Sequence, residues 1–126
     1  MVITYLIDPG KDTVYITAVG VTKDQEWKET SERINQDPKY HDHINVILDM
    51  RQHESVVSTD FVWDYCFSIA NKSQPVKWAI IISREVSLGM TNMLSELLSR
   101  KNFLVKPYTT IQEAEAWISE TLKNEV

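Results

Sequence analysis

Two short and almost wholly apolar runs constrain the fold of this chain more than any other feature. Residues 44–50 and 77–83 have the length of a strand, and apolar side chains occupy most of their positions rather than every second one. Alternation is typical of a strand with one face in water, whereas a near-continuous run is typical of a buried parallel strand. The two runs therefore predict two buried parallel strands.

Strand and helix patterns alternate along the rest of the chain. Residues 2–7 and 13–19 are rich in β-branched and aromatic residues, and Pro9 and Gly10 between them are typical of a turn. In chain order the predicted elements are strands 2–7 and 13–19, helix 23–36, strand 44–50, helix 58–72, strand 77–83, helix 87–101, strand 103–106 and a final helix from 111.

Each predicted helix has a candidate capping residue at its start. A Ser or Thr hydroxyl accepts a hydrogen bond from a backbone N–H of the first turn, and a Glu or Gln three residues later completes a capping box. The expected caps are Thr22 with Gln25, Ser58 or Thr59, Ser87, and Thr110 with Glu113.

The order β-β-α-β-α-β-α-β-α predicts an α/β fold with a single five-stranded sheet, in one domain that spans residues 1–126. Helices between strands act as right-handed crossovers, which makes the strands that they join parallel. The turn 8–12 is too short for a crossover, so the first strand must run antiparallel to the second. The prediction is four parallel strands and one antiparallel N-terminal strand.

Composition and charge narrow the classes of partner and the compartment. The formal net charge is −5 and Lys and Arg form no cluster, which disfavours binding to a nucleic-acid backbone. The first residues contain neither a basic leader nor a long apolar run, so neither a signal peptide nor membrane insertion is expected. The only cysteine, Cys66, cannot form an internal disulfide, which favours a reducing, cytoplasmic environment.

Three short stretches resemble the STAS/SpoIIAA-like group, the small α/β domains of anti-sigma-factor antagonists and sulfate transporters. They are residues 46–51 (VILDMR), 78–82 (WAIII) and 113–118 (EAEAWI). The similarity is to a bacterial branch of the group that is related by fold to Sec14/CRAL-TRIO lipid-transfer domains. The resemblance implies a βα superhelix with strands near sequence order, and a non-enzymatic regulatory or protein-interaction module.

The same resemblance draws attention to Ser58. Antagonist members carry Asp-Ser-Ser-Gly at the start of the helix after the strand, and phosphorylation of that serine switches partner binding. Here the comparable stretch is Val57-Ser58-Thr59-Asp60, which lacks the preceding acid and the glycine. The resemblance implies Ser58 as a phosphorylation site, and simple helix capping is the competing interpretation.

Two arginines predict an anion site. Arg51 and Arg84 each follow an apolar strand, so both are expected at the carboxyl edge of the sheet, where ligands of open α/β sheets bind. Together with Ser58 and Thr59 at a helix start, they suit a carboxylate or phosphate. The alternative is that each arginine pairs with a local acid, Asp49 or Glu54 for Arg51 and Glu85 for Arg84.

Other polar residues give weaker signals. His41, His43 and His53 flank one strand at opposite ends, so they are expected to be solvated loop histidines rather than a metal site. Cys66 has no basic neighbour in sequence and is expected to be a buried, inert thiol. We find no credible nucleophile–base pair and no cofactor motif, so we expect no enzyme; catalysis by Asp49 or His53 is the weakest alternative.

Helix 58–72 is apolar almost all the way round, which is typical of a helix with one face on the core and another on a partner. Phe61, Trp63 and Phe67 are the candidate interaction residues, for a protein partner or a homodimer, unless the aromatics simply fill a thin core. The leading hypothesis is thus a cytoplasmic interaction module. The alternative is a domain that binds a small anion or a lipid-like molecule. A continuous cavity beneath helix 58–72 would favour the ligand, and an exposed aromatic patch the interaction.

Overall fold

The computed structural model describes residues 2–55 and 57–120. Its elements, in chain order, are β1 (Ile3–Asp8), β2 (Thr13–Gly20), α1 (Asp24–Gln36), β3 (Asn45–His53), α2 (Thr59–Ser68), β4 (Val76–Ile81), α3 (Glu85–Leu98), the 3-10 turn η1 (Ser99–Lys101), β5 (Phe103–Tyr108) and α4 (Ile111–Ser119). This order confirms the predicted alternation.

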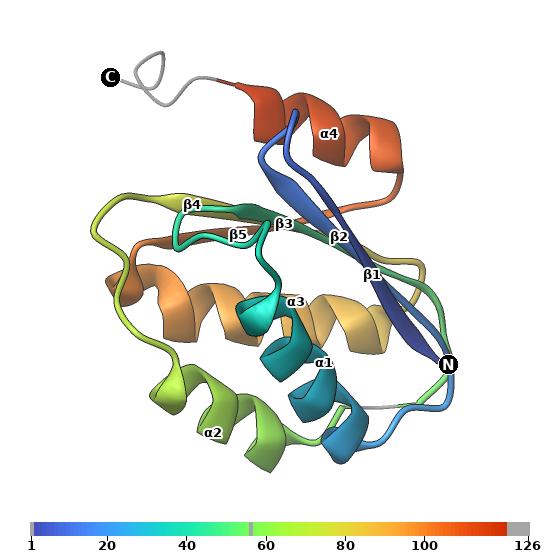
Figure 1. Cartoon of the computed structure of the whole chain (residues 1–126). Helices are drawn as coiled ribbons and strands as arrows, with labels where there is room; N and C mark the ends of the chain where they lie inside the picture. The colour runs from blue at the N-terminus through green and yellow to red at the C-terminus, as the bar shows by residue number, and fades with distance from the viewer. Residues whose placement is uncertain (1, 56, 121–126) are drawn as a thin grey trace.

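One five-stranded sheet forms the centre of the molecule, with its strands in sequence order from β1 to β5 (Figure 1). β1 is antiparallel to β2, and β2, β3, β4 and β5 are parallel to one another. The predicted α/β class and the predicted strand directions are therefore confirmed. Pro107 lies in β5, an edge strand, where its missing N–H interrupts no inner ladder.

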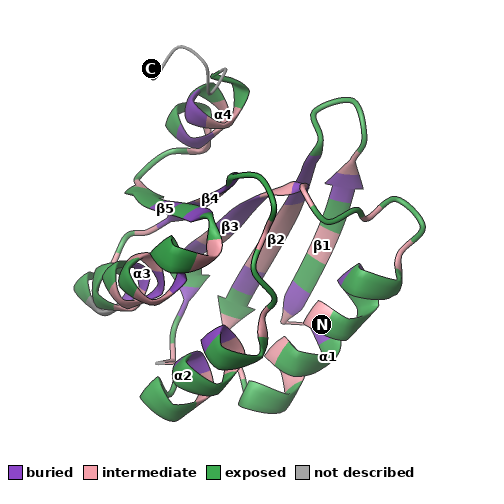
Figure 2. Cartoon of the chain, turned by 90° about the vertical axis from the view of Figure 1, so that its left-hand side faces the viewer, coloured by how far each residue is buried: buried purple, intermediate pink, exposed green. Residues whose placement is uncertain are grey.

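The helices divide unequally between the two faces of the sheet. α1, α2 and α3 cover one face and α4 covers the other (Figures 1 and 2). Right-handed crossovers between strands that follow one another in a single direction place every connecting helix on the same face. α4 follows the last strand and connects to no further one, so it is free to cover the opposite face. It packs there through Ala114 and Trp117 against Ile47, Ala79 and Ile81.

Several predicted boundaries were wrong. β3 continues to His53 instead of ending at residue 50, so Arg51 and His53 belong to the strand. α2 ends at Ser68 rather than 72, because the chain leaves it to meet the turn before β5, where Lys72 N–H donates to Lys101 O. α3 begins at Glu85 with Arg84 as its N-cap, so Ser87 is a buried residue of the first turn rather than a cap.

The start of α1 also differs from prediction. Lys23 rather than Thr22 is the N-cap, and Glu26 rather than Gln25 accepts a hydrogen bond from the cap N–H at 2.8 Å. The Thr22 hydroxyl instead contacts His53 and Trp27. The Thr22 side chain, which the local sequence predicts as a helix cap, thus belongs to a polar cluster with the distant residue His53.

Among the described residues, no helix has the length and apolar character required to span a membrane.

Candidate functional site

A large cavity of about 550 Å³ lies between the sheet and the three helices α1, α2 and α3. Its floor comes from β2, β3, β4 and β5, and its roof from the helices and the segments around Tyr40 and Lys72. The floor residues are Val14, Ile16, Val46, Leu48, Val76, Trp78 and Phe103. The cavity has the size and the apolar character of a small-molecule binding site. We call it the large cavity.

The large cavity is partly open to solvent, and several of its lining side chains, such as Phe61, Tyr65 and Trp78, are only half-buried. Water that enters it meets a mainly apolar lining and finds few hydrogen-bond partners. An apolar molecule in this space would remove that apolar surface from water.

A row of aromatic rings follows the cavity from α2 to the edge of the sheet. Phe61 stacks on Tyr65, Tyr65 meets Trp78, and Trp78 meets the edge of Phe103, with centroid separations of 6.3, 6.3 and 5.2 Å. Burial raises the pKa of Tyr65 to about 12, against the smaller opposite effect of a hydrogen bond with Ser31. The Tyr65 hydroxyl is therefore neutral and able to donate a hydrogen bond at any physiological pH.

α2 has apolar residues on a buried side and on an adjoining exposed side. Val62 and Cys66 are buried on its inner side, and burial raises the pKa of the Cys66 thiol, so the predicted buried cysteine is confirmed. Trp63 and Phe67 stack on its outer side at 5.6 Å and are 44% and 74% exposed. Phe61 is half-buried and lines the large cavity, so it does not join this outer pair. The outer pair is named the Trp63–Phe67 patch.

A bulge in β3 changes which side of the sheet its last residues face. Thr17 pairs with Asp49 and Val19 pairs with Gln52, so β3 holds one more residue than β2 between these two pairs. Before the bulge, Val46 and Leu48 face the large cavity. An extra residue reverses the alternation, and His53 consequently faces α1, where its ring meets that of Trp27 at 6.0 Å.

His53 is 2% exposed, so the expectation of a solvated loop histidine was wrong. Its Nε2 shares hydrogen bonds with the hydroxyls of Thr22 at 2.7 Å and Ser55 at 3.1 Å. Trp27 Nε1 donates to the Thr22 hydroxyl at 2.9 Å. Burial lowers the pKa of His53, and the positive charge of Arg84 lowers it further. A neutral imidazole therefore ties the β2–α1 and β3–α2 connections together.

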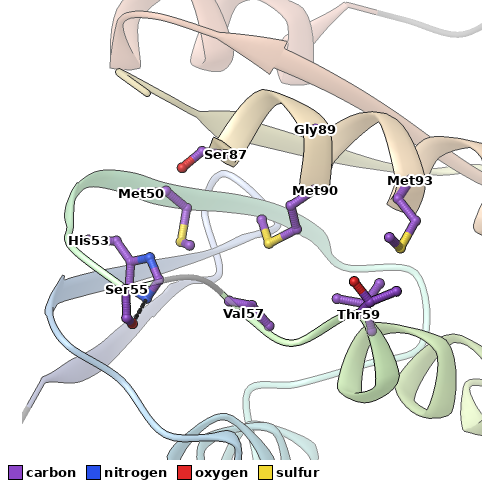
Figure 3. Close-up of a pocket in the computed structure, with 10 residues that line it drawn as sticks. Met50, His53, Ser55, Val57, Thr59, Ser87, Gly89, Met90 and Met93 are labelled. Carbon is purple, nitrogen blue, oxygen red and sulfur yellow. Dashed lines mark hydrogen bonds between the residues drawn. The ribbon is translucent and has the colours of Figure 1, made fainter. Parts of the chain in front are cut away.

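A second, smaller cavity of about 250 Å³ adjoins this cluster, and we call it the His53 pocket. Its lining residues are Met50, His53, Ser55, Val57, Thr59, Val62, Ser87, Gly89, Met90 and Met93. Figure 3 shows Met50 of β3 and Met90 of α3 extending toward Val57, and Met93 of α3 extending toward Thr59. Val57, Val62 and Met90 line both cavities, so the two spaces are neighbours.

The two arginines of the predicted anion site are each engaged within the protein. Arg51 pairs with Asp49 through two hydrogen bonds of 3.0 and 2.8 Å, which is the local pairing named as the alternative. This guanidinium lowers the pKa of Asp49. Arg84 pairs with neither Glu85 nor another described acid, and its Nη1 donates to His53 O at 2.8 Å. Anion binding by these residues stays a prediction.

Ser58 contacts neither Arg51 nor Arg84 in the described hydrogen bonds, and Thr59 forms none with them either. Ser58 is the N-cap of α2: its Oγ accepts from Phe61 N at 3.1 Å and donates to Asp24 Oδ2 at 3.2 Å. A phosphate on Ser58 would meet the favourable helix dipole and the repulsive Asp24 carboxylate together. Thr59 is exposed and borders the His53 pocket. Phosphorylation of Ser58 stays a prediction.

The main cavity residues were not singled out in the sequence, apart from the α2 aromatics. Lys72 and Tyr65 had no motif, and both were assigned to helix 58–72. One signal was available: α1 offers only Trp27 and Ile34 as large apolar residues, too few to fill the layer above several strands.

The described residues hold no group of three His, Cys, Asp or Glu side chains that could bind a metal. Comparisons of the chain with family models, curated proteins and solved structures found no match.

Proposed function

We propose that this protein is a non-enzymatic binding domain that takes an apolar, chain-like molecule into the large cavity. The observation that carries the proposal is the cavity itself, about 550 Å³ of mainly apolar space beneath α2. Burial of an apolar ligand there gains roughly 25 cal/mol for each Å² removed from water. A ligand that binds the folded protein alone also stabilises it, so ligand uptake and folding favour each other.

Membership of the SpoIIAA-like branch and a cytoplasmic location belong to the same proposal. The sheet has its strands in sequence order, as that resemblance implies, which supports the assignment without identifying a ligand. The contacts of the polar side chains also favour binding over catalysis. The Nε2 atom of His53 is shared between two hydroxyls, and Arg51 is held by Asp49. These groups fix the backbone around the cavities.

A second candidate function is a protein-interaction module that uses the Trp63–Phe67 patch. Two stacked aromatic rings, one half-exposed and one largely exposed, are unusual for a surface facing only water, and aromatic residues are enriched at interfaces. A self-complementary patch of this kind needs only one two-fold axis to give a homodimer. The two functions are compatible, because the ligand would lie under α2 and the partner outside it.

Decanol, a neutral single-chain molecule, is the probe for the proposed function. We expect saturable amide NMR shifts in residues that line the large cavity, and native mass spectrometry of the purified protein should detect a retained apolar molecule. Leu48→Phe places a larger side chain in the cavity and should weaken decanol binding by roughly tenfold or more. Leu104→Phe, at an exposed position of β5 outside the cavity, is the matched control. Absence of both saturable shifts and a retained molecule would refute the proposal.

A further inference from the structure

The large cavity is lined mainly by apolar side chains and has few charged ones. Among the described residues that line it, Lys72 and Asp42 are the ones that carry a formal charge at neutral pH. Lys72 lies between α2 and β4, in the segment that carries the chain back to the sheet. A ligand that fills the cavity would therefore meet the Lys72 cation.

The position of Lys72 is fixed by its own backbone. Its N–H donates to Lys101 O at 2.9 Å, and its carbonyl accepts from Asn102 Nδ2 at 2.8 Å. These two bonds join the segment to the turn before β5. A side chain on such a fixed backbone needs less ordering when a ligand binds than one on a free loop.

The Lys72 ammonium is turned toward the aromatic row. Its Nζ lies 5.8 Å from the centroid of the Phe103 ring, and Phe103 is 2% exposed and part of the cavity floor. Lys72 forms no ion pair with any carboxylate of the described residues, whereas Lys11 and Arg51 each do. A cation held over a buried ring, without a counter-charge, is a favourable place for the anionic end of an apolar molecule.

We propose that the ligand is a single-chain carboxylic acid, with its carboxylate at Lys72 and its chain along the row Phe103, Trp78, Tyr65 and Phe61. This inference rests on the proposed function and adds the chemistry of the head group. One lysine is a point charge that matches one negative charge. Asp42 lines the same cavity, and the protein carries a net charge of −5, so a doubly charged phosphate head is repelled more than a carboxylate.

The test compares decanoate with decanol, two chains of equal length that differ in head charge. Calorimetry or amide NMR should show decanoate binding roughly tenfold more tightly than decanol at low salt, with the preference reduced by added salt. Lys72→Met keeps the apolar stem and should remove the preference for decanoate over decanol. Lys72→Arg keeps the charge and should retain it.

Lys106→Met is the matched control, because Lys106 also lies over a ring, 5.1 Å from that of Trp117, on the opposite face of the sheet. It should leave both affinities unchanged. Equal binding of decanoate and decanol to the unmodified protein, or an undiminished preference in folded Lys72→Met, would overturn this inference and leave the proposed function standing. Failure of both probes to bind would overturn both. If Lys72→Met does not fold by circular dichroism, the unmodified protein and Lys72→Arg still decide the matter.

Discussion

The two faces of the sheet hold their helices in different ways. α4 packs directly on the sheet: Ala114 and Ala79 are wholly buried, and Trp117 is 5% exposed. α2 lies on the other face, where its Phe61, Val62 and Tyr65 border the large cavity. Figure 1 shows α2 farther from the sheet than α3.

The ends of α2 and α4, by contrast, are held alike. Neither helix has a basic residue in its last turn, and in each case a lysine from another element donates to the final carbonyls. Lys77 Nζ donates to Trp117 O at 2.8 Å and Glu120 O at 2.9 Å, and Lys101 Nζ donates to Cys66 O at 2.6 Å and Ile69 O at 2.7 Å. α2 is thus anchored at its end while the space beneath it stays open.

The largest expected effect on stability distinguishes the two faces of the sheet. It compares replacement by phenylalanine at two adjacent residues of β3, one facing each side. Ile47 faces α4 and is 1% exposed, so Ile47→Phe overpacks a filled layer and should lower the free energy of unfolding by about 2–3 kcal/mol. Leu48 borders the large cavity, and Leu48→Phe should change stability by less than about 1 kcal/mol. Urea denaturation measures both. Equal destabilisation would mean that the cavity is filled by α2 in solution.

A smaller effect on stability concerns the polar cluster formed by His53, Thr22, Ser55 and Trp27. The pKa of His53 in the folded protein is below its ordinary value, so the unfolded chain takes up a proton first as the pH falls. The stability from neutral His53 is present in full above about pH 6.5 and is lost as the pH falls from there through the folded pKa. The urea midpoint should therefore decrease over this range.

His53→Gln can keep one hydrogen bond but cannot titrate. At pH 7.5 it should cost about 1 kcal/mol of stability, and its deficit should shrink as the pH is lowered. A His53→Gln variant with an unchanged pH dependence would contradict the role assigned to His53.

The smallest expected effect on stability compares the outer sides of α2 and α4. Trp63→Glu and Phe67→Glu alter exposed rings and should change the free energy of unfolding by less than about 0.5 kcal/mol. If the Trp63–Phe67 patch is an interface, sedimentation should show self-association that either change abolishes, because the charge would be buried without a partner. Ala116→Glu, on the exposed side of α4, should leave association intact. An unmodified protein that stays monomeric at high concentration would exclude the homodimer.

Much of the architecture was predictable because it depends on local patterns. The apolar runs that became β3 and β4 indicated buried parallel strands, and the short turn before Thr13 required an antiparallel β1. The two roles of α2 were predictable only in part. Its apolar residues cover more than one stripe of the helix, which indicated two contacting sides. The sequence did not indicate which aromatic residues face the core and which face solvent, because a rotation of the helix about its axis changes their positions.

The sequence by itself determined the order of strands and helices, because side-chain periodicity and crossover handedness act over short stretches of chain. Tertiary structure decided the site. One extra residue in β3 turned His53 toward α1, and the partners of Arg51 and Arg84 depended on which residues the fold placed beside them. The cavity and its cation at Lys72 depend on how far α2 lies from the sheet. That separation results from packing and end-capping between residues distant in sequence, which no local pattern records.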